Sequence, residues 1–565
     1  MLQIQQLISD HINTWITAEL DKKSGRGRSS ASSLKVYGVQ KLRELILDLA
    51  ISGKLIVEKD TNNLEINFLK NIEKEMNELT KKGLLAKRKP LIPISEDEKF
   101  FKLPQSWEWI RLGKTGKIFN GNSINENEKR TKYTNIKNGR PFIATKDVGY
   151  GREKLNYKNG VLIPYDESKF KIAHKNAVLI CSEGGSAGKK IGITEHDIFF
   201  GNKLFANETF SGINPRYIFY VYQSQSFYKS FFKRMTGIIG GIPVKEFLNI
   251  PIPIPPTKLQ NEIVRKIDEL MMLCDQLEQK HINSREAHVK LVKVLLNTLT
   301  QAKDAKEFKN SWQYIAKHFE TLFTSEESLD ELKQTILKVA VMGKLVSQNP
   351  NDESACELIR KIQFQKAKLS KKINVKSKKS LSLTIDDNKP FELPKGWVWA
   401  YLGELVTFEY GYNLPKPKRT NTGEYPVYGS NGVVGTHSQP FVNSKCIVIG
   451  RKGSAGALNL SLSSSCCVTD VAYYCIPPPE LDLIFTFNLF HTLNLDELGK
   501  GIKPGLNRND AYKLILGLPP LAEQNRIVSK VHEFMTLCDE LKSRIQEARV
   551  KKKKISDVLV SRVLD

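Results

Sequence analysis

The stretch Leu103-Pro104-Gln105-Ser106-Trp107-Glu108-Trp109 recurs in similar form as Leu393-Pro394-Lys395-Gly396-Trp397-Val398-Trp399, at an offset of 290 residues. The same offset carries residues 42–55, which end in Gly-Lys-Leu, onto residues 332–345, which end in the same three residues. A solenoid would repeat every 20–50 residues and more than twice. The sequence therefore contains one large module that is present in two copies.

A second block of the module repeats at a different offset. Residues 255–275 match residues 519–539, an offset of 264, and share Pro-Pro, Gln-Asn, Ile-Val and Leu-Cys-Asp in the same order. Two blocks with constant offsets are thus separated by a stretch in which the offset drifts from 290 to 264. We interpret this pattern as a constant frame around two variable inserts.

Each half has a helical part, a middle part and a long helix that follows Pro-Pro. Apolar residues at helical spacing in residues 41–50 predict a helix that ends at Gly53. Short apolar runs such as residues 177–180 and 446–449, bounded by Gly, Pro and Asn, predict strands. We predict an α+β fold in which two similar β-rich domains are separated by long antiparallel helices, with a pseudo-twofold internal duplication. The predicted parts are an N-terminal helical region (1–100), a first β-rich domain (101–257), a central helical spacer and linker (258–392), a second β-rich domain (393–519) and a C-terminal helical spacer (520–565).

The two long helices carry a heptad seam. Residues Ile527, Val531, Phe534, Cys538, Leu541 and Ile545 step by four and three residues, and the helix after Pro256 has the same rhythm. A helix of about 40 residues extends about 60 Å, more than the 34–36 Å of one DNA turn. Two such helices can space two β-rich domains along a duplex. The alternative is a coiled coil that dimerises the chain, but two copies in one chain make an intramolecular pair simpler.

The composition favours a polyanionic partner. The 565 residues include 86 Lys and Arg against 61 Asp and Glu, a net charge of +25, and nucleic acid is the usual partner of such an excess. The alternative is a basic surface without a specific partner. The eight Cys form no CxxC pair, no apolar stretch is long enough to cross a bilayer and the N-terminus does not resemble a signal peptide. We therefore expect a cytoplasmic protein that does not enter a membrane.

Leu-Pro-x-x-Trp-x-Trp ahead of a variable β-rich domain and Pro-Pro-x-x-x-Gln-Asn-x-Ile-Val at the start of a helix, both present twice, resemble the specificity (S) subunit of Type I restriction-modification enzymes. The resemblance covers essentially the whole chain. It implies two target-recognition domains, each of which reads one half of a bipartite site in double-stranded DNA. It also implies that the helices set the spacing and dock two methyltransferase (M) subunits, through which the restriction/translocase (R) subunits join. S-adenosylmethionine, ATP and Mg²⁺ are then expected in the partner subunits only, and no cofactor in this chain.

The second domain follows the motifs of that family more closely than the first. Residues 425–432 resemble its Pro-hydrophobic-Tyr-Gly-Ser-Asn-Gly turn, and residues 449–456 resemble its Arg-Lys-Gly-Ser-x-Gly loop. In the first domain residues 141–148 and 181–190 stand in their place and depart from both motifs. We expect the two domains to read different half-sites, and the departure leaves the role of Glu183 open.

Gly-rich loops that carry Arg, Lys or hydroxyl side chains suit DNA, because exposed backbone N–H groups and cations can approach phosphates and the Arg fork fits guanine. The loops 237–245 and 501–508 are equivalent at offset 264 and complete the set. Solvated hairpin loops are the alternative, and the Lys-rich segments 371–379 and 550–554 can be solvated faces. We assign the four Trp residues of the repeated stretch to core packing rather than base stacking. The predicted DNA-binding residues are Lys146, Ser182, Ser186, Lys189, Lys190, Lys245, Ser430, Asn431, Arg451, Lys452, Ser454, Lys503 and Arg508.

Motifs for catalysis are missing from the sequence. No Pro-Pro pair follows Asn or Asp, as an adenine methyltransferase needs, and no GxxxxGK[ST] loop for ATP is present. The nine His residues form no pair with metal-ligand spacing. We interpret the chain as a DNA-binding subunit and not an enzyme. Two other classes stay open: a scaffold or adaptor whose β-rich domains bind protein or RNA, and a chain with cryptic nuclease or methyltransferase activity.

Overall fold

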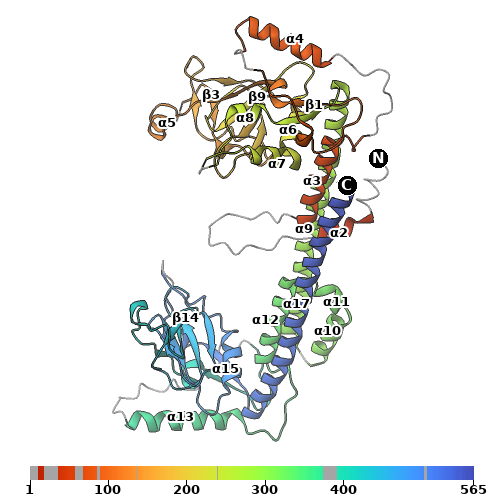
Figure 1. The fold of residues 1–565 in the computed structure, drawn as a ribbon. Helices are drawn as coiled ribbons and strands as arrows, with labels where there is room; N and C mark the ends of the chain where they lie inside the picture. Colours follow the sequence, from red (N-terminus) through yellow and green to blue (C-terminus); the bar gives the residue numbers. More distant parts are fainter. Residues whose placement is uncertain are drawn as a thin grey trace. The chain divides into compact units, whose positions relative to one another are not determined.

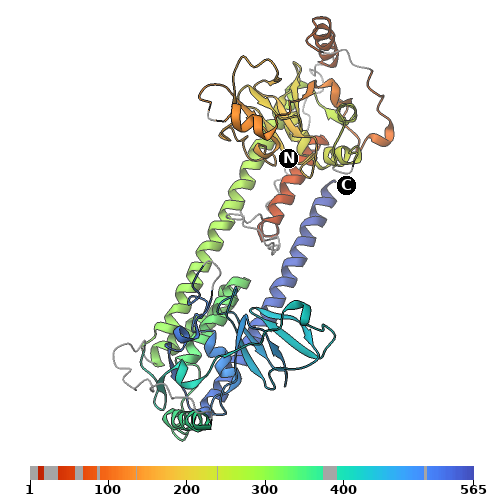
Figure 2. The ribbon, with the colours of Figure 1, turned by 90° about the vertical axis from the view of Figure 1, so that its left-hand side faces the viewer.

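The computed structural model describes residues 10–17, 36–56, 68–85, 90–134, 136–237, 240–303, 305–372, 391–501 and 505–564. The chain divides into two compact units (Figures 1 and 2): unit 1 combines residues 1–283 with 549–565, and unit 2 comprises residues 284–548. Each unit therefore holds one copy of the repeated frame together with a part of each long helix.

In unit 1, helix α3 (Tyr37–Ile51) ends against the repeated Trp stretch. Its Leu and Ile side chains recur at helical spacing and are buried. The chain leaves the helix through Gly53, whose φ of +77° belongs to the left-handed region that glycine adopts most easily. A Cβ on Gly53 would lie only 2.4 Å from Cγ of Pro104, and Trp107 is 5% exposed. The Gly-Lys-Leu and Leu-Pro-x-x-Trp motifs recur together because the first packs on the second.

The first β-rich domain is closed by its own ends, since the opening strand β1 (Glu108–Arg111) pairs antiparallel with the last strand β10 (Pro251–Ile254). Two four-stranded sheets lie between them, in the orders β2-β9-β6-β7 and β4-β3-β8-β5. Their strands are β2 (Gly116–Asn120), β3 (Arg140–Ile143), β4 (Leu162–Ile163), β5 (Ile172–Ala173), β6 (Val178–Cys181), β7 (Ile191–Ile193), β8 (Ile198–Phe200) and β9 (Leu204–Thr209). The other helices of unit 1 are α2 (Ile12–Thr17), α4 (Phe68–Lys81), α5 (Glu126–Lys132), α6 (Pro215–Gln223), α7 (Gln225–Lys233) and α8 (Val244–Leu248), with 3₁₀ turns η1 (Glu96–Glu98), η2 (Leu112–Lys114) and η3 (Thr145–Asp147).

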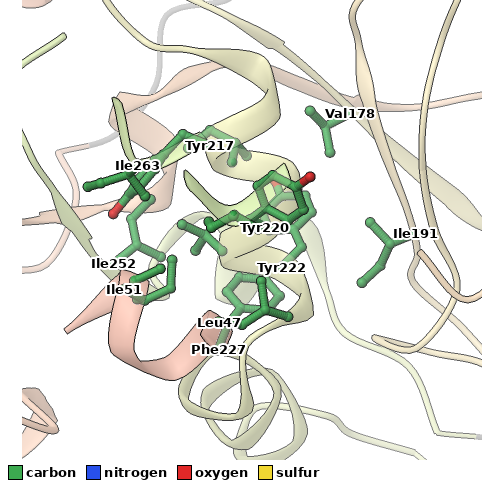
Figure 3. Packing of buried hydrophobic residues seen from close by; sticks show 14 of the residues in the cluster. Leu47, Ile51, Val178, Ile191, Tyr217, Tyr220, Tyr222, Phe227, Ile252 and Ile263 are labelled. Carbon is green, nitrogen blue, oxygen red and sulfur yellow. The ribbon is translucent and has the colours of Figure 1, made fainter. Parts of the chain in front are cut away.

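One continuous core joins this domain to the helices of unit 1. Figure 3 shows Leu47 and Ile51 of α3 in a cluster with Tyr222 and Phe227, whose rings stack at a centroid distance of 4.7 Å. Ile263, near the start of the long helix α9 (Thr257–Gln301), belongs to the same cluster. The β-rich domain is thus held rigidly on the helical frame, because large buried rings leave little freedom to shift.

Unit 2 repeats this plan. Strand β11 (Val398–Tyr401) pairs antiparallel with β19 (Ile515–Leu518), and two sheets have the orders β12-β18-β15-β16 and β14-β13-β17. The strands are β12 (Glu409–Tyr410), β13 (Tyr425–Gly429), β14 (Gly432–His437), β15 (Cys446–Gly450), β16 (Leu458–Ser461), β17 (Cys467–Val468) and β18 (Ala472–Cys475). The helices are α10 (Ala305–Lys317), α11 (Phe319–Leu322), α12 (Glu326–Val341), α13 (Ala355–Lys372), α14 (Leu402–Leu405), α15 (Leu483–Phe490), α16 (Arg508–Ala511) and α17 (Leu521–Leu564), with the 3₁₀ turn η4 (Lys416–Lys418).

The heptad seam is buried within the chain itself. In unit 1 the start of α9 (Ile263 to Cys274) shares a core with Leu559 and Val560 near the end of α17. In unit 2 the last turns of α9 share a core with the first half of α17. The two helices therefore run antiparallel, and the intramolecular pairing predicted from the two copies is confirmed.

The repeated Gln of the Pro-Pro-x-x-x-Gln-Asn motif anchors each long helix to its β-rich domain. Gln260 is 0% exposed; its Nε2 donates to the Pro255 and Gly212 carbonyls, and its Oε1 accepts from the Asn214 amide. Gln524, also 0% exposed, makes the same three kinds of hydrogen bond, to Pro519 O, Glu480 O and Asp482 N. A buried amide with every polar atom paired defines one relative position of helix and domain.

The repeated Leu-Cys-Asp motif also has a structural role. Asp275 pairs with Arg43 at 2.8 Å in unit 1, and its counterpart Asp539 pairs with Lys333 in unit 2. Arg43 and Lys333 are themselves related by the offset of 290 residues. The same cation-carboxylate link thus ties the repeated short helix to the long helix in both units.

The fold class predicted from the sequence is confirmed: two similar β-rich domains, long antiparallel helices and an internal duplication. Trp107, Trp397 and Trp399 are buried, so core packing is confirmed for three of the four Trp residues of the repeated stretch. Trp109 is half-buried and packs on Phe101, as Trp399 packs on Phe391. Most of the Lys-rich segment 371–379 lies outside the described residues.

Candidate nucleic-acid interface

Three loops that are far apart in the sequence meet in the second β-rich domain. They are the β13–β14 turn at Ser430 and Asn431, the loop 451–456 after β15, and the described residues of the closing loop, 500–501 and 505–508. The amide of Leu506 donates to the carbonyl of Arg451 at 2.9 Å, which joins the last two. A Cβ on Gly450 would lie 2.5 Å from the Ser430 carbonyl oxygen, so the turn lies directly against the start of the loop.

The first β-rich domain brings the corresponding three segments together. The amide of Ile242 donates to the Ser182 carbonyl at 3.0 Å, which joins the loop 182–190 to the closing loop 236–245. The ammonium of Lys190 donates to the Thr145 carbonyl at 3.0 Å, which joins the same loop to turn η3. The interface is therefore a three-loop surface that is built once in each unit.

Backbone hydrogen bonds reveal which residues correspond. Because the Ile242–Ser182 bond of the first domain matches the Leu506–Arg451 bond of the second, Ser182 occupies the position of Arg451. The next residues in each loop also correspond, because Glu183 forms an antiparallel bridge with Gly241 and Lys452 forms one with Gly505. Glu183 therefore stands where the second domain has Lys452.

The turn that follows β3 in the first domain and β13 in the second also contains matched residues. In each domain one amide bonds to the strand before the turn, Gly201 N to Ile143 O at 2.9 Å and Thr469 N to Tyr428 O at 3.0 Å. Counted from Ile143 and Tyr428, Lys146 and Asn431 both stand three residues further along. The first domain thus presents a Lys where the second presents the Asn of a two-residue hairpin turn.

Glycine makes the loop tips open and tightly turned. Gly184 and Gly453 have φ values of +81° and +83°, and a Cβ on either would meet no atom within 4 Å. The tips therefore face open space, and no side chain there keeps a ligand away from the backbone.

A cationic-aromatic cluster distinguishes the second domain. The guanidinium carbons of Arg451 and Arg508 lie 4.9 and 4.7 Å from the ring centre of Tyr410, which is 48% exposed. Arg451 also donates to the Asp470 carbonyl at 2.8 Å, and Arg508 to the Phe408 carbonyl at 3.0 Å. These contacts hold both side chains in place while leaving donors of each guanidinium available.

Tyr473, which faces Tyr410 across strands β12 and β18, packs against this cluster. Its ring lies 5.1 Å from that of Tyr410, and burial raises the pKa of its hydroxyl, so the ring stays neutral at physiological pH. The positions in the first domain are occupied by Asn120 and Phe205, which pair in register as Tyr410 and Tyr473 do. With Ser182 in place of Arg451, the described residues of the first domain lack the cluster at the matching positions, and the cation-aromatic contact of the loop 182–190 is instead that of Lys190, whose ammonium lies 5.6 Å from the ring centre of Tyr150.

The predicted site residues differ in exposure. Lys146, Lys189, Lys245, Asn431 and Lys452 are exposed on the three-loop surfaces, and Ser186, Lys190, Ser430, Arg451, Ser454 and Arg508 are half-buried there. Ser182 is 2% exposed, and its backbone rather than its side chain joins the loops. Lys503 lies outside the described residues.

Sequence reasoning did not find Tyr410, Tyr473 or the position of Glu183. The aromatic run Phe408-Glu409-Tyr410-Gly411-Tyr412, next to a predicted basic loop, was the available signal for the cluster. The Gly-Ser-Ala-Gly shared by residues 185–188 and 453–456 aligns the two loops in sequence, but at an offset of 268 that would match Glu183 with Arg451 rather than with Lys452.

Within the described ranges, no group of three or more His, Cys, Asp or Glu side chains is arranged to hold a metal ion. Among the described helices, none combines the length and apolar character needed to span a bilayer.

Comparisons with known proteins agree with this architecture. Residues 104–286 and 394–549, one β-rich domain and adjoining helix each, match the family described as Type I restriction modification DNA specificity domain. Two Escherichia coli proteins, the Type I restriction enzyme EcoEI and EcoAI specificity subunits, are 33% and 34% identical over alignments that cover 100% of this chain and of each relative. A chain from a structure described as the basis of complex assembly and conformational transition of the type I R-M system has a TM-score of 0.51 at 16% identity, covering 82% of this chain and 99% of that one.

Two copies of one helix-and-sheet module, each with a three-loop surface, define an internally duplicated protein with two variable β-rich domains. The chain belongs to the Type I restriction-modification DNA specificity subunit family.

Proposed function

We propose that this chain gives a Type I restriction-modification complex its DNA specificity, with each β-rich domain reading one half of a bipartite site. The observation that carries the proposal is the three-loop surface, which occurs twice on the same backbone plan with different side chains. A constant frame with unlike side chains suits two unlike half-sites better than it suits one repeated ligand.

The surfaces have the chemistry for both parts of DNA recognition. The exposed cations Lys146, Lys189, Lys245 and Lys452 are placed to bind phosphates, which positions a protein on the duplex without reading its sequence. Arg451 and Arg508 are held by Tyr410 and by backbone carbonyls, and a held guanidinium fork is the group that reads guanine O6 and N7. The second domain therefore reads at least one guanine in its half-site.

Exposed apolar side chains on the two long helices indicate where partner subunits bind. At offset 264, three exposed apolar positions recur on the long helices: Leu273 and Leu537 at 44% and 49% exposure, Leu291 and Ile555 at 51% and 49%, and Val294 and Val558 at 64% and 48%. Unit 1 holds Leu273, Ile555 and Val558, and unit 2 holds Leu537, Leu291 and Val294. Each unit thus exposes the same three positions, as two copies of one partner require.

We assign these positions to two methyltransferase (M) subunits, one on each unit, with the restriction/translocase (R) subunits joining through them. The long helices set the spacing of the two half-sites. In this assignment S-adenosylmethionine, ATP and Mg²⁺ are bound by the partners, this chain carries no cofactor, and the complex acts in the cytoplasm on double-stranded DNA.

The test is selection from random duplexes by the purified chain with its M partner. We expect enrichment of one split motif, with affinity that falls steeply as salt rises. One uninterrupted motif, or no motif, would contradict the proposal. Affinity that ignores DNA sequence and salt would favour a scaffold that binds protein or RNA.

Partner docking has its own test. Leu273→Asp and Leu537→Asp should each weaken binding of one M subunit, and the double variant should bind none. Phe364→Asp is the matched control, because Phe364 is 71% exposed but is replaced by Lys74 at the corresponding position of the first copy. Stoichiometry is read by native mass spectrometry, and a variant pair that still binds two M subunits would contradict the assignment.

A further inference from the structure

The two loop tips carry opposite charges at one matched backbone site, where the first domain has Glu183 and the second has Lys452. The bridge from Glu183 to Gly241 corresponds to the bridge between Lys452 and Gly505. The next amide, that of Gly184, donates to the Gly240 carbonyl at 2.7 Å. The backbone on both sides of Glu183 is therefore held, and the carboxylate projects from a defined place.

The carboxylate of Glu183 is available for a ligand. The residue is exposed, and its side chain forms no hydrogen bond or ion pair with any part of the chain that the structure describes. Its Cγ would lie 3.2 Å from a Cβ at position 241, so the glycine there gives the side chain its room. Lys189 is exposed on the same loop, and Lys146 is exposed on the adjoining turn η3.

An exposed carboxylate on a phosphate-binding surface lowers affinity unless a donor pairs with it. An ionised carboxylate only accepts hydrogen bonds, and phosphates and sugar ring oxygens offer it none. In the major groove the donors are the exocyclic amino groups, N4 of cytosine and N6 of adenine.

We propose that Glu183 is a specificity-determining residue that accepts a hydrogen bond from the exocyclic amino group of one cytosine or adenine in the half-site of the first domain. This inference rests on the proposed function. The corresponding Lys452 offers donors only, so the two half-sites differ in chemical type at the matched position: a base donor for the first domain, and a phosphate or base acceptor for the second.

The experiment uses the full chain with its M partner and duplexes in which one half-site is randomised at a time. We expect Glu183→Ala and Glu183→Lys to lose a preference of roughly tenfold at one base pair of the first half-site and to leave the second unchanged. Lys452→Ala, the matched control, should leave the first half-site unchanged. N4-methylcytosine and N6-methyladenine, placed at the affected position, identify which amino group is bound.

The outcomes separate the inference from the function on which it rests. If the wild-type complex selects a split motif and Glu183→Gln only raises affinity for all sequences equally, the carboxylate faces phosphates and the inference is wrong. The inference is also wrong if Glu183→Ala and Glu183→Lys leave every base preference unchanged. If the wild-type complex selects no split motif, the proposed function itself fails.

Discussion

The guanidinium of Arg451 lies over the ring of Tyr410, at 4.9 Å from its centre, while its Nη1 donates to the carbonyl of Asp470 at 2.8 Å. A side chain that long ordinarily loses rotamer freedom when it binds a ligand. Here the ring and the carbonyl have already restricted Arg451, so a ligand meets a preorganised donor. The same ring holds Arg508, which gives the second domain two oriented guanidinium groups on one exposed aromatic side chain.

We expect Arg451→Ala to lower preference for a guanine in the second half-site by roughly tenfold and to leave the first half-site unchanged. Arg451→Lys should also lose this preference although it retains the charge, because Lys lacks the planar fork. Selection from half-randomised duplexes gives both preferences. Circular dichroism of each variant checks that the domain is folded.

The matched variant is Lys452→Ala, at the neighbouring exposed position. A phosphate contact there predicts a uniform loss of affinity over all sequences and a salt-dependence slope that falls by about 1. A uniform loss for Arg451→Ala as well would mean that Arg451 contacts phosphate and reads no base.

The repeated helices and the Trp stretch were predictable because the duplication shows each of their structural positions twice in the sequence. Pairs such as Gly53 with Gly343 occur at equal offsets, and a motif that recurs with its packing partner must keep the contact between them. The burial of Trp107 and Trp397 was predictable for the same reason. The ion pair between Arg43 and Asp275 was missed, since its two halves lie in blocks with different offsets.

The site was predictable only in part. Gly-rich basic loops are visible in the sequence, but their meeting depends on hydrogen bonds between segments about 50 residues apart, such as that from Leu506 to Arg451. Insertions change the offset to 285 at Asn431 and Lys146, and to 269 at Lys452 and Glu183. The family motifs place these segments opposite each other in sequence, and backbone pairing in three dimensions then fixes which residue matches which.

Gln260→Ala should destabilise unit 1 by roughly 3 kcal/mol, because it leaves the half-buried amide of Asn214 and the Pro255 carbonyl without a partner, while the Gly212 carbonyl keeps only its hydrogen bond from Thr257. Urea unfolding followed by Trp fluorescence measures the change. Lys258→Ala, at an exposed position on the same turn of α9, is the control and should change the free energy of unfolding by less than about 0.5 kcal/mol. Equal stability of the two variants would contradict an anchoring role for Gln260.

Gly53→Ala should cost more stability than Gly83→Ala, although the two glycines have similar φ values of +77° and +71°. A Cβ at Gly83 meets nothing within 4 Å, so that variant bears only the backbone strain of about 1 kcal/mol. A Cβ at Gly53 lies 2.4 Å from Pro104 Cγ, so either the helix end or the Trp stretch must move. The difference between the two variants in the free energy of unfolding measures the contact between the Gly-Lys-Leu and Leu-Pro-x-x-Trp motifs. Equal free energies would mean that the stability of α3 does not depend on this contact.

Asp48 on α3 accepts a hydrogen bond through its Oδ1 from the Gln225 amide at 3.1 Å. Burial raises the pKa of Asp48 from its ordinary value of 3.8 to about 6, and the hydrogen bond from Gln225 opposes part of that shift. Between about pH 4 and pH 6 the folded state binds this proton more tightly than the unfolded state. The contribution to stability is therefore present below about pH 4 and is lost as pH rises to about 6, by about 3 kcal/mol in total.

Asp48→Asn keeps an oxygen that can accept from Gln225 but cannot ionise. We expect it to match the wild-type chain near pH 4 and to exceed its stability above pH 6, in unfolding curves measured at fixed salt. Gln105→Asn, which changes a neutral exposed side chain of unit 1, should give a curve parallel to that of the wild-type chain at every pH. Parallel curves for Asp48→Asn and the wild-type chain would show that the Asp48 carboxyl titrates alike in the folded and unfolded states, and that its burial against α7 does not control the pH dependence of unit 1.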